Sequence, residues 1–457
     1  MSSSLFFIPD DLISEVLSLL NVKSILRFRC VSKFWDTLIT DPIFVNLHLK
    51  KSEKLNPHVI LTSWHTKTIT PYGSDHDGEY TGESPYGSDD DGEYTGESPY
   101  GSDNDVHGVI PHSISSILEN PWFTLYVDSD YLVEDKGCSS MVGSCNGLIC
   151  LDGLTGTREY YEYWFRLWNP ATRTTSPKFG FLRLFHNRPH YTSSYSDDGF
   201  YKFTFGCDDS TGTYKLVASR HNYSELRSNV RILSLGDNVW REIQSFPVDP
   251  LCLRLRGETG VSFKSTINWL AVHNTVWYIG DDYKDITIDQ FLIVSLDLST
   301  ETYNQYLLPP DFDQVPPQPP IIGVLGDRLF FSSRYNETDF IIWQMEKFGV
   351  EDSWTQFLKI SCHSLQIDYD YSEHMKHFFE LIPLFLSKDG DTLILKCTQE
   401  DQEILYNWRN NTVVRTNITA TTTTTDDETS NSASYSANGY FESLVSVFGV
   451  IKRTANN

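Results

Sequence analysis

Short apolar runs separated by turn residues fill most of this chain, and they limit what it can fold into. From about residue 137 onward the runs come in pairs, among them YKFTFGCDDSTGTYKLVAS (201–219) and FLIVSLDLSTETYNQYLLP (291–309). Gly, Asn, Asp and Pro stand at the turns and long helical patterns are scarce, so this region is predicted to be antiparallel β-structure. GSCNGLICL (143–151) places Asn146-Gly147 between two apolar runs, which predicts a tight hairpin.

So many paired strands favour a closed architecture. Roughly 300 residues, divided into four-stranded units of about 40–50 residues, give a β-propeller of six or seven blades. Radial closure protects the sheet edges, so a propeller is preferred to a large sandwich or an open barrel. The propeller is expected to span residues 109–450 and to include a polar low-complexity loop at 419–439. After that loop, YFESLVSVF (440–448) is expected to return as one last strand that completes the first blade.

The first fifty residues show the periodicity of helices rather than of strands. Apolar side chains repeat at helical spacing and form one stripe of a short helix that begins after Pro9: Leu12, Ile13, Val16, Leu17 and Leu20. A second helix over 22–31 and a third, capped by Ser32, complete a small all-α module that Asp41-Pro42 ends. Three short helices cannot bury so many apolar side chains by themselves. Some of these side chains are therefore predicted either to dock on the rest of the chain or to contact another protein.

An acidic repeat follows this helical module. YGSDHDGEYTGESP (72–85) recurs as YGSDDDGEYTGESP (86–99), and a third copy begins at residue 100. Residues 72–105 hold eleven Asp or Glu and no Lys or Arg, so they carry much of the net charge of −25. Such a segment has little to bury, and we expect a disordered acidic linker over 66–108. A plain spacer is preferred to a site for a basic partner, and an EF-hand fails because both end ligands of the loop are missing.

The charge and the cysteines restrict the kinds of partner and compartment. A net charge of −25 disfavours nucleic acid and anionic membranes as partners. No signal peptide and no apolar run of the ~18 residues needed to span a bilayer is visible. The eight cysteines form no CxxC and no dense framework, which favours a reducing compartment. A cytoplasmic and/or nuclear location is therefore expected.

Candidate chemistry is sparse. The chain has no phosphate-binding, dinucleotide-binding, serine-hydrolase or zinc-protease motif. Cys145 lies in the expected hairpin, where a small buried thiol is preferred to a nucleophile. His374 and His377 are spaced for one face of a helix, but two histidines are a weak metal signal and a solvated surface is preferred. No catalytic residue, metal site or cofactor is predicted.

Residues 6–49 resemble an F-box, the helical module that attaches substrate receptors to the Skp1-like adaptor of cullin-RING ubiquitin ligases. The resemblance is carried by Ile8-Pro9, by the apolar set around Cys30-Val31 and by Ser32-Lys33 with Trp35. It implies that adaptor contacts come from the positions that match the motif: Ile8, Pro9, Leu12, Ile13, Val16, Leu17, Leu26, Cys30, Val31 and Trp35. Any one of these side chains could equally belong to the core of the module, so a mixture of the two roles is expected, with Trp35 sharing both.

The region 137–409 resembles the plant F-box-associated interaction domain, a kelch-like propeller. The carrying segments are GSCNGLICL, LWNPATR, YKLVA, INWLAV and VSLDLSTETYNQYLLP, although the kelch diglycine is missing. The two resemblances together imply a non-catalytic substrate-recognition subunit of an SCF-type E3 ligase, whose propeller binds a target protein. Two alternatives are a propeller-type protein- or glycan-binding scaffold without a ligase role, and an enzyme with its active site at the central channel.

Overall fold

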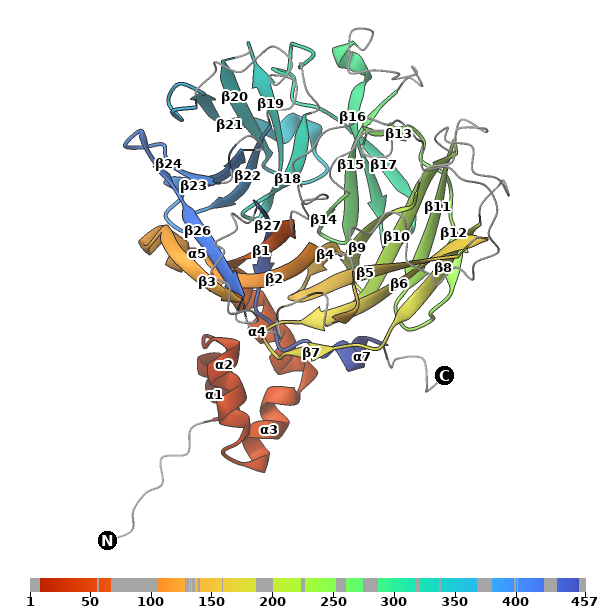
Figure 1. Ribbon diagram of the computed structural model, residues 1–457, viewed down its shortest axis with the longest axis vertical. Helices are drawn as coiled ribbons and strands as arrows, with labels where there is room; N and C mark the ends of the chain where they lie inside the picture. The colour runs from red at the N-terminus through yellow and green to blue at the C-terminus, as the bar shows by residue number, and fades with distance from the viewer. Residues whose placement is uncertain are drawn as a thin grey trace, which may run out of the picture.

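The computed structural model describes a helical module followed by a ring of β-sheets (Figure 1). The residues it describes are 9–55, 57–66, 105–127, 131, 133, 136–138, 140–157, 159–185, 200–222, 227–251, 260–273, 287–316, 320–336, 338–367, 380–397, 400, 402–422 and 434–451. The helices in these ranges are too short or too polar to cross a bilayer.

The N-terminal module consists of α1 (Asp10–Leu17), α2 (Val22–Arg29), α3 (Lys33–Thr40) and α4 (Pro42–Leu55). The side chain of Asn21 accepts a hydrogen bond from the backbone N–H of Ser24 at 2.9 Å and so caps α2. Ser32 caps α3 in the same way, as the sequence predicts. Pro42 begins α4, a helix that follows the three expected ones, because proline at the first helical position lacks only an N–H that would have no partner there.

The core of the module is formed by Leu17, Ile25, Ile39 and Phe44. His48 of α4 is fully buried beside it, stacked on Phe44, and its Nε2 lies 3.0 Å from the carbonyl oxygen of Leu20. Burial lowers the pKa of His48, although the carbonyl of Leu20 and the charge of Glu442 oppose the shift. Helix α4 is thereby joined to the end of α1.

Five sheets of antiparallel strands follow one another along the chain and form the first to fifth blades. The first contains β4 (Ser140–Cys145), β5 (Leu148–Gly156), β6 (Tyr160–Asn169), β7 (Thr174–Thr175) and β8 (Phe179–Phe185); the second contains β9 (Lys202–Asp208), β10 (Thr213–Asn222), β11 (Arg227–Ser234) and β12 (Trp240–Glu242). The third contains β13 (Asp249–Pro250), β14 (Val261–Phe263), β15 (Thr266–Val272), the 3-10 turn η4 (Ile288–Gln290), β16 (Phe291–Asp297) and β17 (Tyr303–Leu307). The fourth contains β18 (Ile321–Leu325), β19 (Arg328–Tyr335), β20 (Asp339–Met345), η5 (Glu351–Ser353) and β21 (Trp354–Ser361); the fifth contains β22 (Leu381–Leu386), β23 (Thr392–Cys397), β24 (Glu403–Asn407) and β25 (Thr412–Arg415).

A sixth sheet, here named the closing sheet, joins the two ends of the propeller. It consists of β2 (Asp105–Ser113), β1 (Pro57–Thr66) and β27 (Ser434–Phe441), in that order and all antiparallel. Helix α5 (Ile114–Glu119) packs on it, and β3 (Trp122–Val127) pairs in parallel with β26 (Asn417–Thr422). The predicted propeller boundary at 109 is therefore wrong, because β1 already belongs to the ring.

The innermost strands show that the ring is closed. Within the described residues, β27 contacts β4, β4 contacts β9, β9 contacts β14, β14 contacts β18, β18 contacts β22, and β22 returns to β27. Figure 1 shows the sheets arranged around one axis. The described sheets thus form six blades, within the predicted range of six or seven.

The buried apolar residues lie between neighbouring blades. Leu329 and Phe331 of β19 pack in the cluster between the third and fourth blades, whereas Phe330 packs in the cluster between the fourth and fifth. Successive side chains of a strand point to opposite faces, so a strand with a blade on either side buries both faces. This explains why strands such as β16 read as continuous apolar runs rather than as an alternating pattern.

The acidic repeat is not a linker between the two domains. Strands β1 and β2 pair along their whole length, with Thr66 opposite Asp105, and residues 67–104 connect them. These connecting residues lie outside the described ranges. The repeat is therefore an insertion between two paired strands of the closing sheet, and the prediction of an interdomain spacer over 66–108 is wrong in its location.

The C-terminal part also differs from the prediction. The loop expected at 419–439 contains the end of β26 and most of β27, so only residues 423–433 between them lie outside the described ranges. The last strand, β27, ends at Phe441, and a short helix, α7 (Val447–Ile451), follows. Strand β27 closes the ring by pairing with β1 and lying beside the first blade, rather than by joining the first blade itself.

One kind of turn recurs between paired strands of the blades. An Asp or Asn side chain accepts a hydrogen bond from a backbone N–H two or three residues later, as Asp297 does from Ser299 at 2.8 Å. The fourth residue after that Asp or Asn has a positive φ in each case: Arg173, Gly212, Glu301 and Asn411. The segments NPATR, DDSTG, DLSTE and NWRNN are thus versions of one turn.

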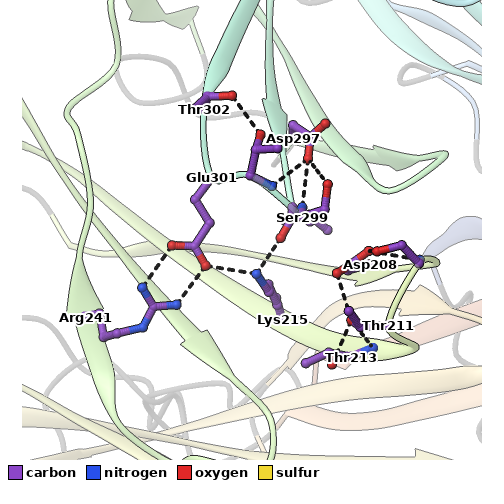
Figure 2. A network of polar contacts seen from close by, with 12 residues as sticks. Asp208, Thr211, Thr213, Lys215, Arg241, Asp297, Ser299, Glu301 and Thr302 are labelled. Carbon is purple, nitrogen blue, oxygen red and sulfur yellow. Dashed lines mark hydrogen bonds and ion pairs between the residues drawn. The ribbon is translucent and has the colours of Figure 1, made fainter.

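Glu301 uses its unusual backbone position to connect two blades (Figure 2). Its φ of 58° is disfavoured for residues other than glycine and asparagine. Its carboxylate receives two hydrogen bonds from Arg241 of the second blade, at 2.7 and 2.9 Å, and one from Lys215 at 2.9 Å. These partners lower the pKa of Glu301 to about 2, Arg241 contributing most, although burial opposes the shift. Lys215 also donates to the carbonyl oxygen of Leu298.

Candidate partner-binding surface

The apolar stripe of α1 divides into two adjacent rows. Three side chains pack in or against the module's core: Ile13, Leu17 and Leu20. Three others, spaced in the same way one residue earlier, are exposed: Leu12, Val16 and Leu19. Side chains four residues apart lie next to each other along a helix, so Leu12 and Val16 form a continuous exposed apolar strip. Val16 is 63% exposed.

The turn between α2 and α3, together with the first turn of α3, carries a second group of exposed apolar side chains. Val31 is 65% exposed, and Cys30 and Phe34 are also exposed. Trp35 is half-buried, because its ring stacks on Phe28 with 5.3 Å between centroids. Phe34 lies edge-on to Trp35. Trp35 thus has one part inside the module and one part at its surface.

The structure divides nine of the ten predicted adaptor-contact residues into three groups. Exposed residues are Pro9, Leu12, Val16, Cys30 and Val31. Half-buried residues are Ile13, Leu26 and Trp35. Leu17 is only 4% exposed and belongs to the core, so it supports the surface from beneath and has almost no area to offer a partner. Ile8 lies outside the described residues.

Sequence reasoning missed three exposed apolar residues of the module: Leu19, Phe34 and Ile43. Leu19 follows Val16 by three residues and extends the outer row of α1. Phe34 adjoins Trp35 in the sequence, and that adjacency was the available signal. Ile43 stands at the start of α4, a helix that was not expected, so no periodicity pointed to it.

Charged side chains lie on the same helices as these apolar groups. Asp10 and Asp11 lie exposed in the first turn of α1, where the positive end of the helix dipole favours them. Arg29 pairs with Asp36 at 2.8 Å, and Lys51 pairs with Glu15. An apolar centre with a charged rim is the usual composition of a protein–protein interface. The surface is therefore suited to bind another protein, and no catalytic group is needed for that.

Cys145, the residue weighed as a nucleophile, lies in the hairpin that the sequence predicts. Asn146 and Gly147 both have positive φ, and Cys145 pairs with Leu148 across the turn. A hydrogen bond with Cys207 and, as the second largest cause, burial raise the pKa of the Cys145 thiol well above its usual value. The thiol therefore stays protonated, which opposes a role as a nucleophile. His374 and His377 lie outside the described residues, and the described residues contain no cluster of three metal-ligating side chains.

Two family models match the chain. The one described as "F-box domain" matches residues 5–47, and the one described as "F-box associated beta propeller domain" matches residues 123–447. The second match covers more than half of the chain. The two matches correspond to the helical module and to most of the ring.

Three curated relatives from Arabidopsis thaliana illustrate the similarity. An F-box/kelch-repeat protein is 24% identical over 363 residues, which covers 77% of this chain and 79% of the relative. The F-box protein CPR1 is 22% identical over 399 residues, covering 85% of this chain and 79% of the relative. Another F-box protein is 54% identical over 44 residues, which is 10% of this chain and 11% of the relative.

Solved structures with some likeness to the chain include a propeller domain and an α-L-arabinofuranosidase. The β-propeller domain of the Trilobed protease from Pyrococcus furiosus has a TM-score of 0.32 at 10% identity, covering 63% of this chain and 74% of that chain. An α-L-arabinofuranosidase from Fusarium graminearum has a TM-score of 0.31 at 9% identity, covering 64% and 72%. These TM-scores are too low to establish a shared fold. The ring is established by the strand contacts described above.

Proposed function

The chain belongs to the F-box proteins that carry an F-box associated β-propeller domain, and we propose that it is the substrate-recognition subunit of an SCF-type E3 ubiquitin ligase. In this role the F-box binds a Skp1-like adaptor and, through it, a cullin-RING assembly. The propeller binds a target protein. The alternative without a ligase role is a propeller scaffold that binds protein or glycan.

The observation that carries the proposal is the exposed apolar surface on α1 and on the turn between α2 and α3. Leu12, Val16 and Val31 face solvent although the core of the module lies next to them. Keeping several large apolar side chains in water is unfavourable, since each fully buried Val or Leu contributes about 1.5–3 kcal/mol. A helical partner that covers them accounts for their exposure.

The chain contributes binding rather than chemistry in this proposal. The RING protein and the conjugating enzyme supply the transfer of ubiquitin, and this chain holds the target near them. The gain in rate then comes from effective concentration, because a tethered target meets the conjugating enzyme far more often than a free one. We also propose a cytoplasmic and/or nuclear location, which fluorescence microscopy of the tagged chain would test.

The test compares two exposed valines of the F-box with a similarly exposed valine of the propeller, all in the full-length chain. Val16→Asp and Val31→Asp are expected to weaken co-purification with a Skp1-like adaptor by about 10-fold or more, since a contact of about 1.5–3 kcal/mol is lost. Val239→Asp is the matched control, because Val239 is 60% exposed on the second blade. Point variants are preferable to removing the module, because its removal would also uncover Leu444, which packs against it.

Two outcomes would contradict the proposal. If both F-box variants bind the adaptor as the wild type does, the apolar surface is not the contact. If the folded wild-type chain does not bind a Skp1-like adaptor at all, the scaffold alternative replaces the ligase role.

A further inference from the structure

The segment after the last strand runs between the F-box and the first blade. Residues 442–446, here named the C-terminal strap, connect β27 to α7 without regular secondary structure. Figure 1 shows the end of the chain returning to the edge of the ring from which the helices extend. The strap contacts both the F-box and the propeller.

Its F-box side is held by Glu442 and Leu444. The Oε2 atom of Glu442 accepts a hydrogen bond from the backbone N–H of Val22 at 3.2 Å, at the first residue of α2. A carboxylate at this place is stabilised by the positive end of the helix dipole. The carbonyl oxygen of Glu442 accepts from Ser52 of α4 at 2.8 Å. Leu444 packs against the core of the F-box, so the strap supplies part of that core.

Its propeller side is held by Ser443 and Val445. Asn169, fully buried at the end of β6, donates from Nδ2 to the carbonyl oxygens of Ser443 at 3.0 Å and Val445 at 2.9 Å. Val445 packs against the core between the first and second blades. A Cβ added at Gly147 would lie 2.5 Å from Ser443, so only glycine lets the strap lie this close to the β4–β5 turn. The NGL and WNP segments of the sequence thus meet at the strap.

The strap holds the F-box and the propeller together because neighbouring side chains of the strap pack against different cores. Leu444 points into the F-box core, and its neighbour Val445 points into the propeller core. The strap follows directly on β27, the strand that closes the ring. Closure of the propeller and attachment of the F-box are therefore carried out by one continuous piece of chain.

We propose that the C-terminal strap fixes the orientation of the F-box on the propeller, with Glu442 and Leu444 as its positioning residues. This inference rests on the proposed function for its biological meaning. A target on the propeller is then held at a set distance and angle from the adaptor. Without these contacts the F-box would turn about the connection between α4 and β1, and the effective concentration of the target at the conjugating enzyme would fall.

The first experiment measures orientation directly and requires no partner. Spin labels are attached to Cys30, which is exposed, and to a second cysteine made by Asp327→Cys, an exposed position between β18 and β19 in the fourth blade. Mass spectrometry verifies two labels per chain, and pulsed electron spin resonance then gives the distribution of distances between them. The wild-type strap is expected to give one narrow distance, and Glu442→Gln combined with Leu444→Ala is expected to lose it.

Val445→Ala is the matched control, since it removes a similar apolar side chain from the opposite side of the same strap. It is expected to lower the melting temperature of the propeller and to keep the single narrow distance. If the Glu442/Leu444 double variant keeps a distribution as narrow as that of the wild type, the strap does not set the orientation. The inference is also overturned if Val445→Ala broadens the distribution as much as the double variant does.

The second experiment reads the consequence for ubiquitination. In a reconstituted ligase, the wild-type chain is expected to be ubiquitinated on a restricted set of its own lysines, as read by mass spectrometry. The double variant is expected to bind the adaptor normally and to be modified over a wider set. An unchanged lysine pattern would contradict the positioning role, whereas failure of the wild type to bind the adaptor would contradict the proposed function and leave the distance measurement readable.

Discussion

Glu301→Gln is expected to weaken the contact between the second and third blades, and to do so mainly at neutral pH. The Glu301 side chain is 19% exposed and that of Lys215 is 9% exposed, so their charges are largely removed from water. Glutamine has nearly the same shape and keeps the backbone at the same positive φ. The substitution therefore isolates the loss of the negative charge that Arg241 and Lys215 bind.

The magnitude follows from the pKa of Glu301. The fall from 4.5 to about 2 corresponds to about 3 kcal/mol of stabilisation at pH 7, at about 1.4 kcal/mol for each pH unit. The Arg241 side chain is 47% exposed, so water screens part of this, and we expect a loss of about 2 kcal/mol. For a ring of this size that is a fall of a few degrees in Tm.

The dependence on pH supplies the sharper test. Because the folded pKa is the lower one, the contribution of Glu301 is fully present above pH 4.5 and is lost as the pH falls toward about 2. The difference in Tm between wild type and Glu301→Gln should therefore be constant from pH 7 to pH 5 and shrink to less than half at about pH 3. Glu242→Gln, at an exposed neighbouring position on β12, should show no such difference. A Glu301→Gln variant as stable as the wild type at pH 7, or a difference that does not change with pH, would refute the reasoning.

Three further predictions concern the rest of the chain. Gly153→Ala is expected to lower Tm by the equivalent of about 1–3 kcal/mol, because its Cβ would lie 2.2 Å from the buried ring of Trp164; an unchanged Tm in thermal unfolding would contradict this packing. Replacement of residues 67–104 by a two-residue Asn-Gly turn is expected to leave Tm and adaptor binding unchanged, since the strands on either side pair directly, and a loss of folding in circular dichroism would contradict that register. Brief alkylation of the native protein is expected to label Cys30 well before Cys145, because Cys30 is exposed whereas contact with Cys207 and burial raise the pKa of the Cys145 thiol; mass spectrometry that finds equal labelling would contradict the placement.

The F-box shows what helical periodicity can predict about the exposure of apolar side chains and what it cannot. The stripe on α1 was wider than a small core can cover, so the presence of exposed apolar side chains followed from the sequence. Which row faces outward did not, because the rows that contain Val16 and Leu17 are equally apolar. Only the packing of α4 and of Leu444 against the module decides that Leu17 is buried and Val16 is exposed.

The acidic repeat shows the limit of reading domains along a chain. Its composition predicts a segment with nothing to bury, and its place between a helical and a β-rich region suggested a linker. The strand at 57–66 precedes the repeat and pairs with residues on its far side. Such pairing depends on contacts across about forty residues of sequence, and a local sequence pattern cannot predict these contacts.

By itself the sequence determined the features whose causes lie within a few residues. The hairpin at Asn146-Gly147, the cap at Ser32 and the apolar stripe on α1 all follow from backbone preference or side-chain period. The tertiary structure alone decided that β27 pairs with β1 and that Asn169 and Val22 hold opposite sides of the strap. These partners are separated by hundreds of residues, and they meet only because the closed ring brings its two ends together.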